Sequence, residues 1–93
     1  MSRFLIEVPH EAGMAACARA VEALLKSGSH FLTHADWGCK DGVHKAWVTV
    51  EVQDRNEARG IVPPEFRTRA TVIELNTFTV AEAEHMLRQQ ESK

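Results

Sequence analysis

The chain has 93 residues, enough for one compact domain, and we expect residues 1–93 to form a single domain. Eleven basic and thirteen acidic residues give a net charge of −2, which argues against a nucleic-acid-binding protein. No apolar run approaches the roughly 18 residues of a membrane span, and the first ten residues do not resemble a signal peptide. We therefore expect a cytoplasmic protein whose partners are neither nucleic acids nor membranes.

The first part of the chain predicts a strand, a helix and a second strand. Residues 3–10 alternate with a period of two, which is typical of a strand. Residues 11–26 carry an apolar stripe with helical spacing, and Gly28 follows as a helix terminator. Residues 30–36 are short and apolar and predict a second strand. Two glycines and an aspartate within residues 37–42 predict a turn.

The second part predicts a strand, a short helix, a strand and a terminal helix. Residues 43–53 alternate clearly and predict a strand. Residues 54–61 begin with a capping aspartate and end before a proline pair, as a short helix does. Residues 69–78 predict a strand with apolar residues on both faces. Thr79 and Glu82 form the two ends of a capping box that begins the last helix.

This order of elements predicts an α+β fold. Two consecutive strand–helix–strand units indicate a ferredoxin-like βαββαβ antiparallel sheet, here with an additional C-terminal helix. In that fold the spatial order of the strands is fourth, first, third, second. The helices cover one face of such a sheet, while the strands carry apolar residues on both. We therefore expect a homodimer in which the open sheet faces of two subunits pack together.

This pattern resembles the dimeric α/β-barrel superfamily over nearly the whole chain. The resemblance is to small bacterial proteins, some of which bind nickel and others of which are muconolactone-isomerase-like isomerases or oxygenases. It implies a ferredoxin-like subunit within a dimeric α/β barrel. The resemblance lies in architecture rather than in a short motif, so it implies a fold and not one particular activity.

The positions of the histidines predict a cluster at one edge of the sheet. A turn centred on Cys39 places His34 opposite His44, with side chains that start about 4.5–5.5 Å apart. The first and third strands are antiparallel neighbours in this fold, so His10 at the end of the first lies beside His44 at the start of the third. A slip of one residue in the hairpin would turn His34 to the opposite face.

This cluster predicts a transition-metal site. Three neutral imidazoles suit Zn, Ni, Cu or Fe in a partly open coordination sphere. Cys39 at the tip of the turn adds a thiolate, and Glu11 or Asp36 adds a carboxylate. Cys17 lies within the apolar stripe of the first helix, where we expect it to pack as a small apolar residue.

Two other functions fit the same residues. The first is a cofactor-free isomerase or oxygenase, in which one of His10, His34 and His44 transfers protons at the mouth of an apolar pocket. The second is an interaction module without a site, in which the histidines are only structural. His85 lies on the terminal helix, where we expect it to be exposed and without a role.

Overall fold

The computed structural model describes residues 1–91, so residues 92–93 of the predicted domain lie outside the described residues. The fold is α+β, with a four-stranded antiparallel sheet in the order β2-β3-β1-β4. In chain order the elements are β1 (Ser2–Pro9), α1 (Met14–Leu25), the 3₁₀ turn η1 (Leu32–His34), β2 (Asp36–Trp37), the 3₁₀ turn η2 (Cys39–Asp41), β3 (Lys45–Val52), α2 (Arg55–Ile61), α3 (Pro64–Arg67), β4 (Thr71–Leu75) and α4 (Val80–Glu91). The predicted strand order is confirmed, and the arrangement is compatible with a ferredoxin-like fold.

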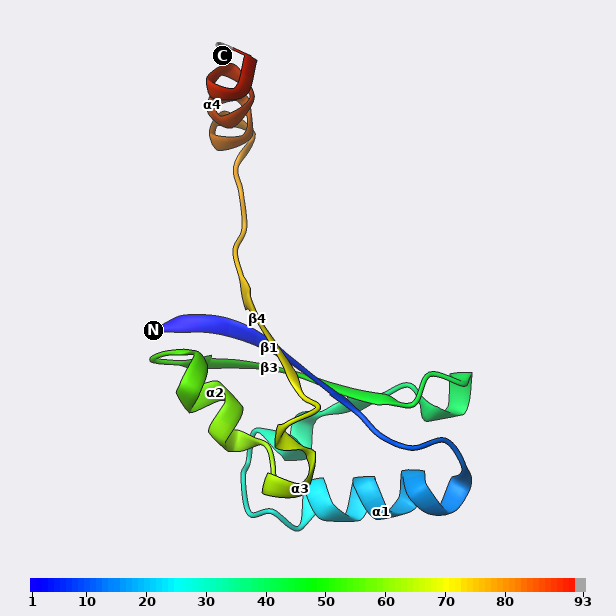
Figure 1. The fold of residues 1–93 in the computed structure, drawn as a ribbon. Coiled ribbons are helices and arrows are strands. Elements are labelled where there is room, and N and C mark those ends of the chain that lie inside the picture. The colour runs from blue at the N-terminus through cyan, green and yellow to red at the C-terminus, as the bar shows by residue number, and fades with distance from the viewer. Residues whose placement is uncertain (92–93) are drawn as a thin grey trace.

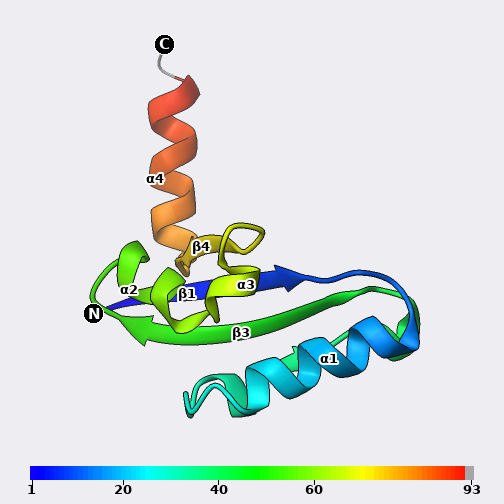
Figure 2. The same cartoon turned by 60° about the horizontal axis from the view of Figure 1, so that its bottom comes forward.

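The central strand β1 determines how the rest of the sheet is placed. Figure 2 shows it between β3 and β4, and it is antiparallel to both. Its pairing with β3 runs from Ser2 opposite Val52 to Pro9 opposite Lys45. One further bond, from the backbone N–H of His10 to the carbonyl of His44 at 3.0 Å, extends the pairing beyond Pro9. The register therefore brings the first and third predicted strands together as expected.

The core lies on one face of the sheet, where the alternating side chains of the strands are buried. Figure 1 shows α1, α2 and α3 on this side, while α4 projects away from the opposite side. The period of two predicted from the sequence is confirmed by the burial pattern, because residues at every second position of β1 and β3 are buried. The buried strand residues are Phe4, Ile6, Val8, Ala46, Val48, Val50, Val52 and Val72.

The prediction of a strand over residues 30–36 is wrong for most of that segment. The backbone there forms local bonds instead: His34 N donates to the carbonyl of Phe31 at 3.2 Å, and Ala35 N to that of Leu32 at 3.3 Å. The hydroxyl of Thr33 also donates to the carbonyl of His30 at 2.7 Å. These bonds satisfy the backbone without a neighbouring strand, while Leu32 is fully buried in the core. Within the hairpin predicted before β3, only the two residues of β2 pair with β3.

The register of this short pairing also differs from the prediction. Asp36 lies opposite Trp47, and Trp37 lies opposite Ala46. The predicted pairing of His34 with His44 is therefore wrong. The physical reason is that residues 32–34 form η1 instead of a strand. The hairpin loop therefore lies later in the chain than a turn centred on Cys39.

The C-terminal part of the chain departs less from its prediction. A further short helix, α3, begins at the second proline of the pair, and β4 is shorter than the predicted strand over 69–78. The capping box of α4 is confirmed: Glu82 N donates to Thr79 Oγ1, and Thr79 N donates to Glu82 Oε1, both at 3.1 Å. No residue within Val80–Glu91 is buried. No helix among residues 1–91 is long and apolar enough to cross a membrane.

Candidate metal centre

Three side chains from separate segments meet where β1 ends and β3 begins. His10 follows β1, Cys39 begins η2, and His44 precedes β3. One ligand atom from each, a ring nitrogen or the cysteine sulfur, lies within 4.8 Å of the other two. The predicted convergence of His10 and His44 is thus confirmed, and its cause is the register of β1 with β3.

The loop between β2 and β3 positions Cys39. Gly38 N donates to the carbonyl of Lys45 at 3.1 Å, which closes the base of the loop. A Cβ atom at Gly38 would lie 2.8 Å from the carbonyl of Val43 and 2.9 Å from the ring of Trp47, so only glycine fits there. Gly42, with φ of 81°, adopts the left-handed conformation that ends η2. The two glycines therefore allow the tight loop that carries Cys39 beside His10.

His10 is oriented in the way that a metal-binding histidine usually is. The residue is buried, with 8% of its surface exposed, and Nδ1 donates to the backbone carbonyl of Glu11 at 2.8 Å. Because a carbonyl oxygen can only accept, Nδ1 carries the imidazole proton, and Nε2 presents its lone pair to Cys39 Sγ, 3.0 Å away. A backbone carbonyl that holds the second ring nitrogen fixes the tautomer needed for metal binding.

His44 contributes a buried nitrogen that has no partner. Its ring lies 5.7 Å from that of His10, with an angle of 73° between the planes. His44 Nδ1 is buried, and no hydrogen-bond partner for it exists within residues 1–91. A buried polar atom left unpaired costs about 1–3 kcal/mol, so a positive ion or a donor near this nitrogen would remove a real penalty.

The environment of Cys39 keeps its thiol protonated when no metal is bound. Burial raises the pKa of the thiol above its ordinary value of 9.0, and the hydrogen bond and charge interaction with Cys17 raise it further. A backbone hydrogen bond acts in the opposite direction. A metal ion at this position must therefore displace a proton from sulfur.

This donor set is selective for a class of ions. Two imidazole nitrogens and a thiolate suit Zn, Ni, Cu or Fe, whereas Mg and Ca prefer oxygen ligands. On a tetrahedral zinc ion a nitrogen and a sulfur ligand are about 3.6 Å apart, given Zn–N and Zn–S bonds of about 2.05 and 2.3 Å. The observed 3.0 Å between His10 Nε2 and Cys39 Sγ requires only a small opening of the pair. Three protein ligands leave one coordination position open.

Three of the predicted ligands lie outside this group. His34 is exposed on η1, so the prediction that it joins His10 and His44 is wrong. Asp36 is exposed on β2. The carboxylate of Glu11 pairs with Arg69 at 3.1 Å, and only the Glu11 backbone contacts His10.

Cys17 is the residue whose role the sequence did not reveal. It lies on α1, is half-buried, and contributes to the raised pKa of the Cys39 thiol. The two cysteines line a cavity of about 400 Å³ that His44 also borders. The helical stripe predicts that Cys17 faces inward, but only the tertiary structure places it at the same cavity as Cys39.

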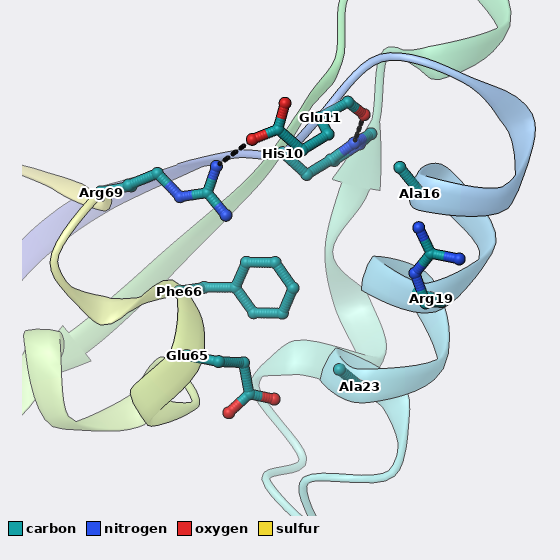
Figure 3. Close-up of a pocket in the computed structure, with 8 residues that line it drawn as sticks. All are labelled: His10, Glu11, Ala16, Arg19, Ala23, Glu65, Phe66 and Arg69. Carbon is teal, nitrogen blue, oxygen red and sulfur yellow. Dashed lines mark hydrogen bonds and ion pairs between the residues drawn. The ribbon is translucent and has the colours of Figure 1, made fainter.

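A second cavity, of about 360 Å³, lies between α1 and α3 and is bordered by His10 (Figure 3). The ring of Phe66 points into it, and the Arg69 guanidinium lies 6.0 Å from the centre of that ring. The ion pair between Arg69 and Glu11 closes one end of the cavity, next to His10. His10 therefore borders a space large enough for a small molecule.

Comparisons with known proteins add no family to this description. No protein-family model, no curated protein and no solved structure matches the chain.

Proposed function

We propose that this protein binds one transition-metal ion through His10, Cys39 and His44. The observation that carries the proposal is the meeting of three soft or borderline ligand atoms within 4.8 Å of one another. Two features of the same group support it: the carbonyl of Glu11 holds His10 in the required tautomer, and the buried Nδ1 of His44 has no partner within residues 1–91. The ion belongs to the set of Zn, Ni, Cu and Fe.

The chemistry of such a site depends on its open position. A bound ion of this class supplies a Lewis acid that can polarise a small molecule or lower the pKa of a bound water. The protein's own contribution is to orient the His10 imidazole and to keep the Cys39 thiol beside it and His44.

Metal binding is tested on protein purified without an affinity tag, since a polyhistidine tag binds the same ions. We expect elemental analysis after incubation with Zn or Ni, followed by desalting, to give about one equivalent of metal per chain. The Cu and Fe contents are measured in the same samples. A content below about a tenth of an equivalent for all four metals would reject the proposal.

A second function is favoured by the cavity between α1 and α3, which His10 borders. A cofactor-free acid–base catalyst of the isomerase or oxygenase class needs a histidine at the edge of a pocket, and His10 borders the cavity around Phe66. This function predicts that a small aromatic compound binds the metal-free protein as well as the metal-loaded one. If such binding occurs and metal binding does not, the catalyst is the better assignment.

We also propose that the chain forms a homodimer, as a distant member of the dimeric α/β-barrel superfamily. Support comes from the strand order and from two uncovered apolar surfaces of the same chain. The first is the open face of the sheet, where Leu5 pairs with the 41% exposed Ile73. The second is the apolar side of α4 and the residue preceding Thr79, where Phe78, Val80, Met86 and Leu87 are 48–76% exposed. In a dimer each surface gains a partner from the second copy.

Light scattering at micromolar concentration is expected to give twice the mass of the chain. The double substitution Met86→Glu and Leu87→Glu places two charges in the apolar stripe of α4. It is expected to produce a monomer, because these two side chains are about half exposed in the single chain and would be buried in the dimer. The matched control Glu84→Gln changes the same helix at an exposed polar position and is expected to remain dimeric. A monomeric wild-type protein would contradict the homodimer.

A further inference from the structure

The proximity of Cys17 to Cys39 has a role that the metal site alone does not require. Cys17 comes from α1 and Cys39 from η2, both line one cavity, and the Cys17 thiol raises the pKa of Cys39. Only Cys39 belongs to the group whose ligand atoms lie within 4.8 Å of one another. Both cysteines are half-buried and border the same cavity, so a small molecule can reach the two sulfur atoms.

We propose that Cys17 and Cys39 form a redox-sensitive pair that controls the metal site. Oxidation by a peroxide joins the two sulfur atoms in a disulfide, withdraws Cys39 from the metal and releases the ion. This inference rests on the proposed metal-binding function. The formation of the disulfide, however, can be tested without any metal.

The structure gives this step a short path. Cys17 and Cys39 line the same cavity, and the Cys17 thiol is close enough to raise the pKa of Cys39, so the bond needs a local approach rather than a refolding of the chain. The N-terminal turn of α1 can supply that movement. Met14 at its start is 90% exposed, and Gly13 caps the helix without a side-chain hydrogen bond among the described residues. Few contacts therefore oppose a shift of this turn toward η2.

The chemistry balances with hydrogen peroxide as the oxidant. The sulfur of Cys17 attacks one peroxide oxygen and becomes a sulfenic acid, and the other oxygen leaves as water. The sulfur of Cys39 then attacks the sulfenic sulfur and displaces a second water. Two electrons pass from the two sulfur atoms to the peroxide. Because a disulfide sulfur carries no thiolate charge, Cys39 no longer holds the ion, and only two imidazoles remain.

The test follows metal and disulfide in the same sample. Zinc-loaded wild-type protein is treated with hydrogen peroxide, released zinc is measured with a chromogenic chelator, and intact mass spectrometry follows oxidation. We expect zinc release in step with a loss of about 2 Da, the two hydrogens of the dithiol. Peptide mapping should join Cys17 to Cys39. Dithiothreitol followed by fresh zinc should restore binding.

The variant Cys17→Ala is expected to bind about one equivalent of zinc, the same content as wild type, and to keep most of it under the same peroxide dose. Cys17→Ser serves as a second variant, and circular dichroism checks that both fold. Equal zinc release from wild type and both variants would overturn the inference, as would release accompanied only by added oxygen. If the reduced variants lose more than about tenfold in zinc affinity, Cys17 is itself a metal ligand, and the inference that it acts only as the redox partner of Cys39 is overturned.

Failure of the inference and failure of the proposed function give different results. If the wild type binds no metal but the metal-free chain still forms the Cys17–Cys39 disulfide, the metal function fails and the dithiol pair stands. If the wild type binds metal but peroxide forms no disulfide in either state, only the redox inference fails.

Discussion

Replacing any one of His10, Cys39 and His44 with alanine is expected to lower metal affinity by more than about 100-fold. Changes to residues that merely orient metal ligands already cost about 10–100-fold, and loss of a ligand costs more. The largest effect is expected for Cys39→Ala, since the thiolate supplies the only negative charge among the three ligand atoms. Isothermal titration calorimetry with Zn or Ni measures these affinities directly.

The controls for this series are two of the three histidines that the structure leaves exposed. His34→Ala on η1 and His85→Ala on α4 are expected to bind metal as the wild type does, because neither side chain belongs to the group. Circular dichroism of each variant separates loss of a ligand from loss of the fold. If His10→Ala and His44→Ala both retain full affinity, the two rings are only structural.

Metal affinity is also expected to rise with pH between about pH 7 and pH 8.5. Since burial and Cys17 hold the pKa of the Cys39 thiol above 9.0, the metal-free thiol stays protonated throughout this range. Each bound ion must therefore release that proton. Apparent affinity is then expected to increase about tenfold for each pH unit, and to fall by the same factor as the solution is acidified.

Calorimetry in two buffers of different ionisation enthalpy counts the released proton. Cys17→Ala removes a hydrogen bond and a charge interaction that raise the pKa of Cys39, so its affinity should stop rising at a lower pH than in wild type. Burial remains the first cause of the raised pKa in that variant. An affinity that does not change over this pH range would show that Cys39 does not bind the ion.

The sequence predicted that His10 and His44 lie side by side, because the apolar pattern of two strands determines their positions. Alternating apolar residues define β1 and β3, and a one-residue slip between them would move every buried side chain to solvent. The register of these two strands is therefore determined by hydrophobic burial. That register alone brings the end of one strand to the start of the other, with His10 beside His44.

The failure at His34 has an equally physical cause. A short apolar segment such as residues 30–36 buries Leu32 equally well from a strand or from a 3₁₀ turn. Local hydrogen bonds around Thr33 favour the turn, and they are invisible to a pattern of apolar residues. Because the turn forms, the strand β2 begins only at Asp36, and His34 is exposed at the surface.

The sequence by itself thus determined the α+β class, the strand order and the adjacency of two histidines, because burial of alternating apolar residues is a strong and periodic signal. Only the tertiary structure decided which third residue joins them. Cys39 reaches His10 through a glycine-dependent loop packed on Trp47, and α1 places Cys17 at the cavity that Cys39 also lines. Such contacts join residues far apart in the chain, and their free energy depends on the packing of whole elements rather than on any local pattern.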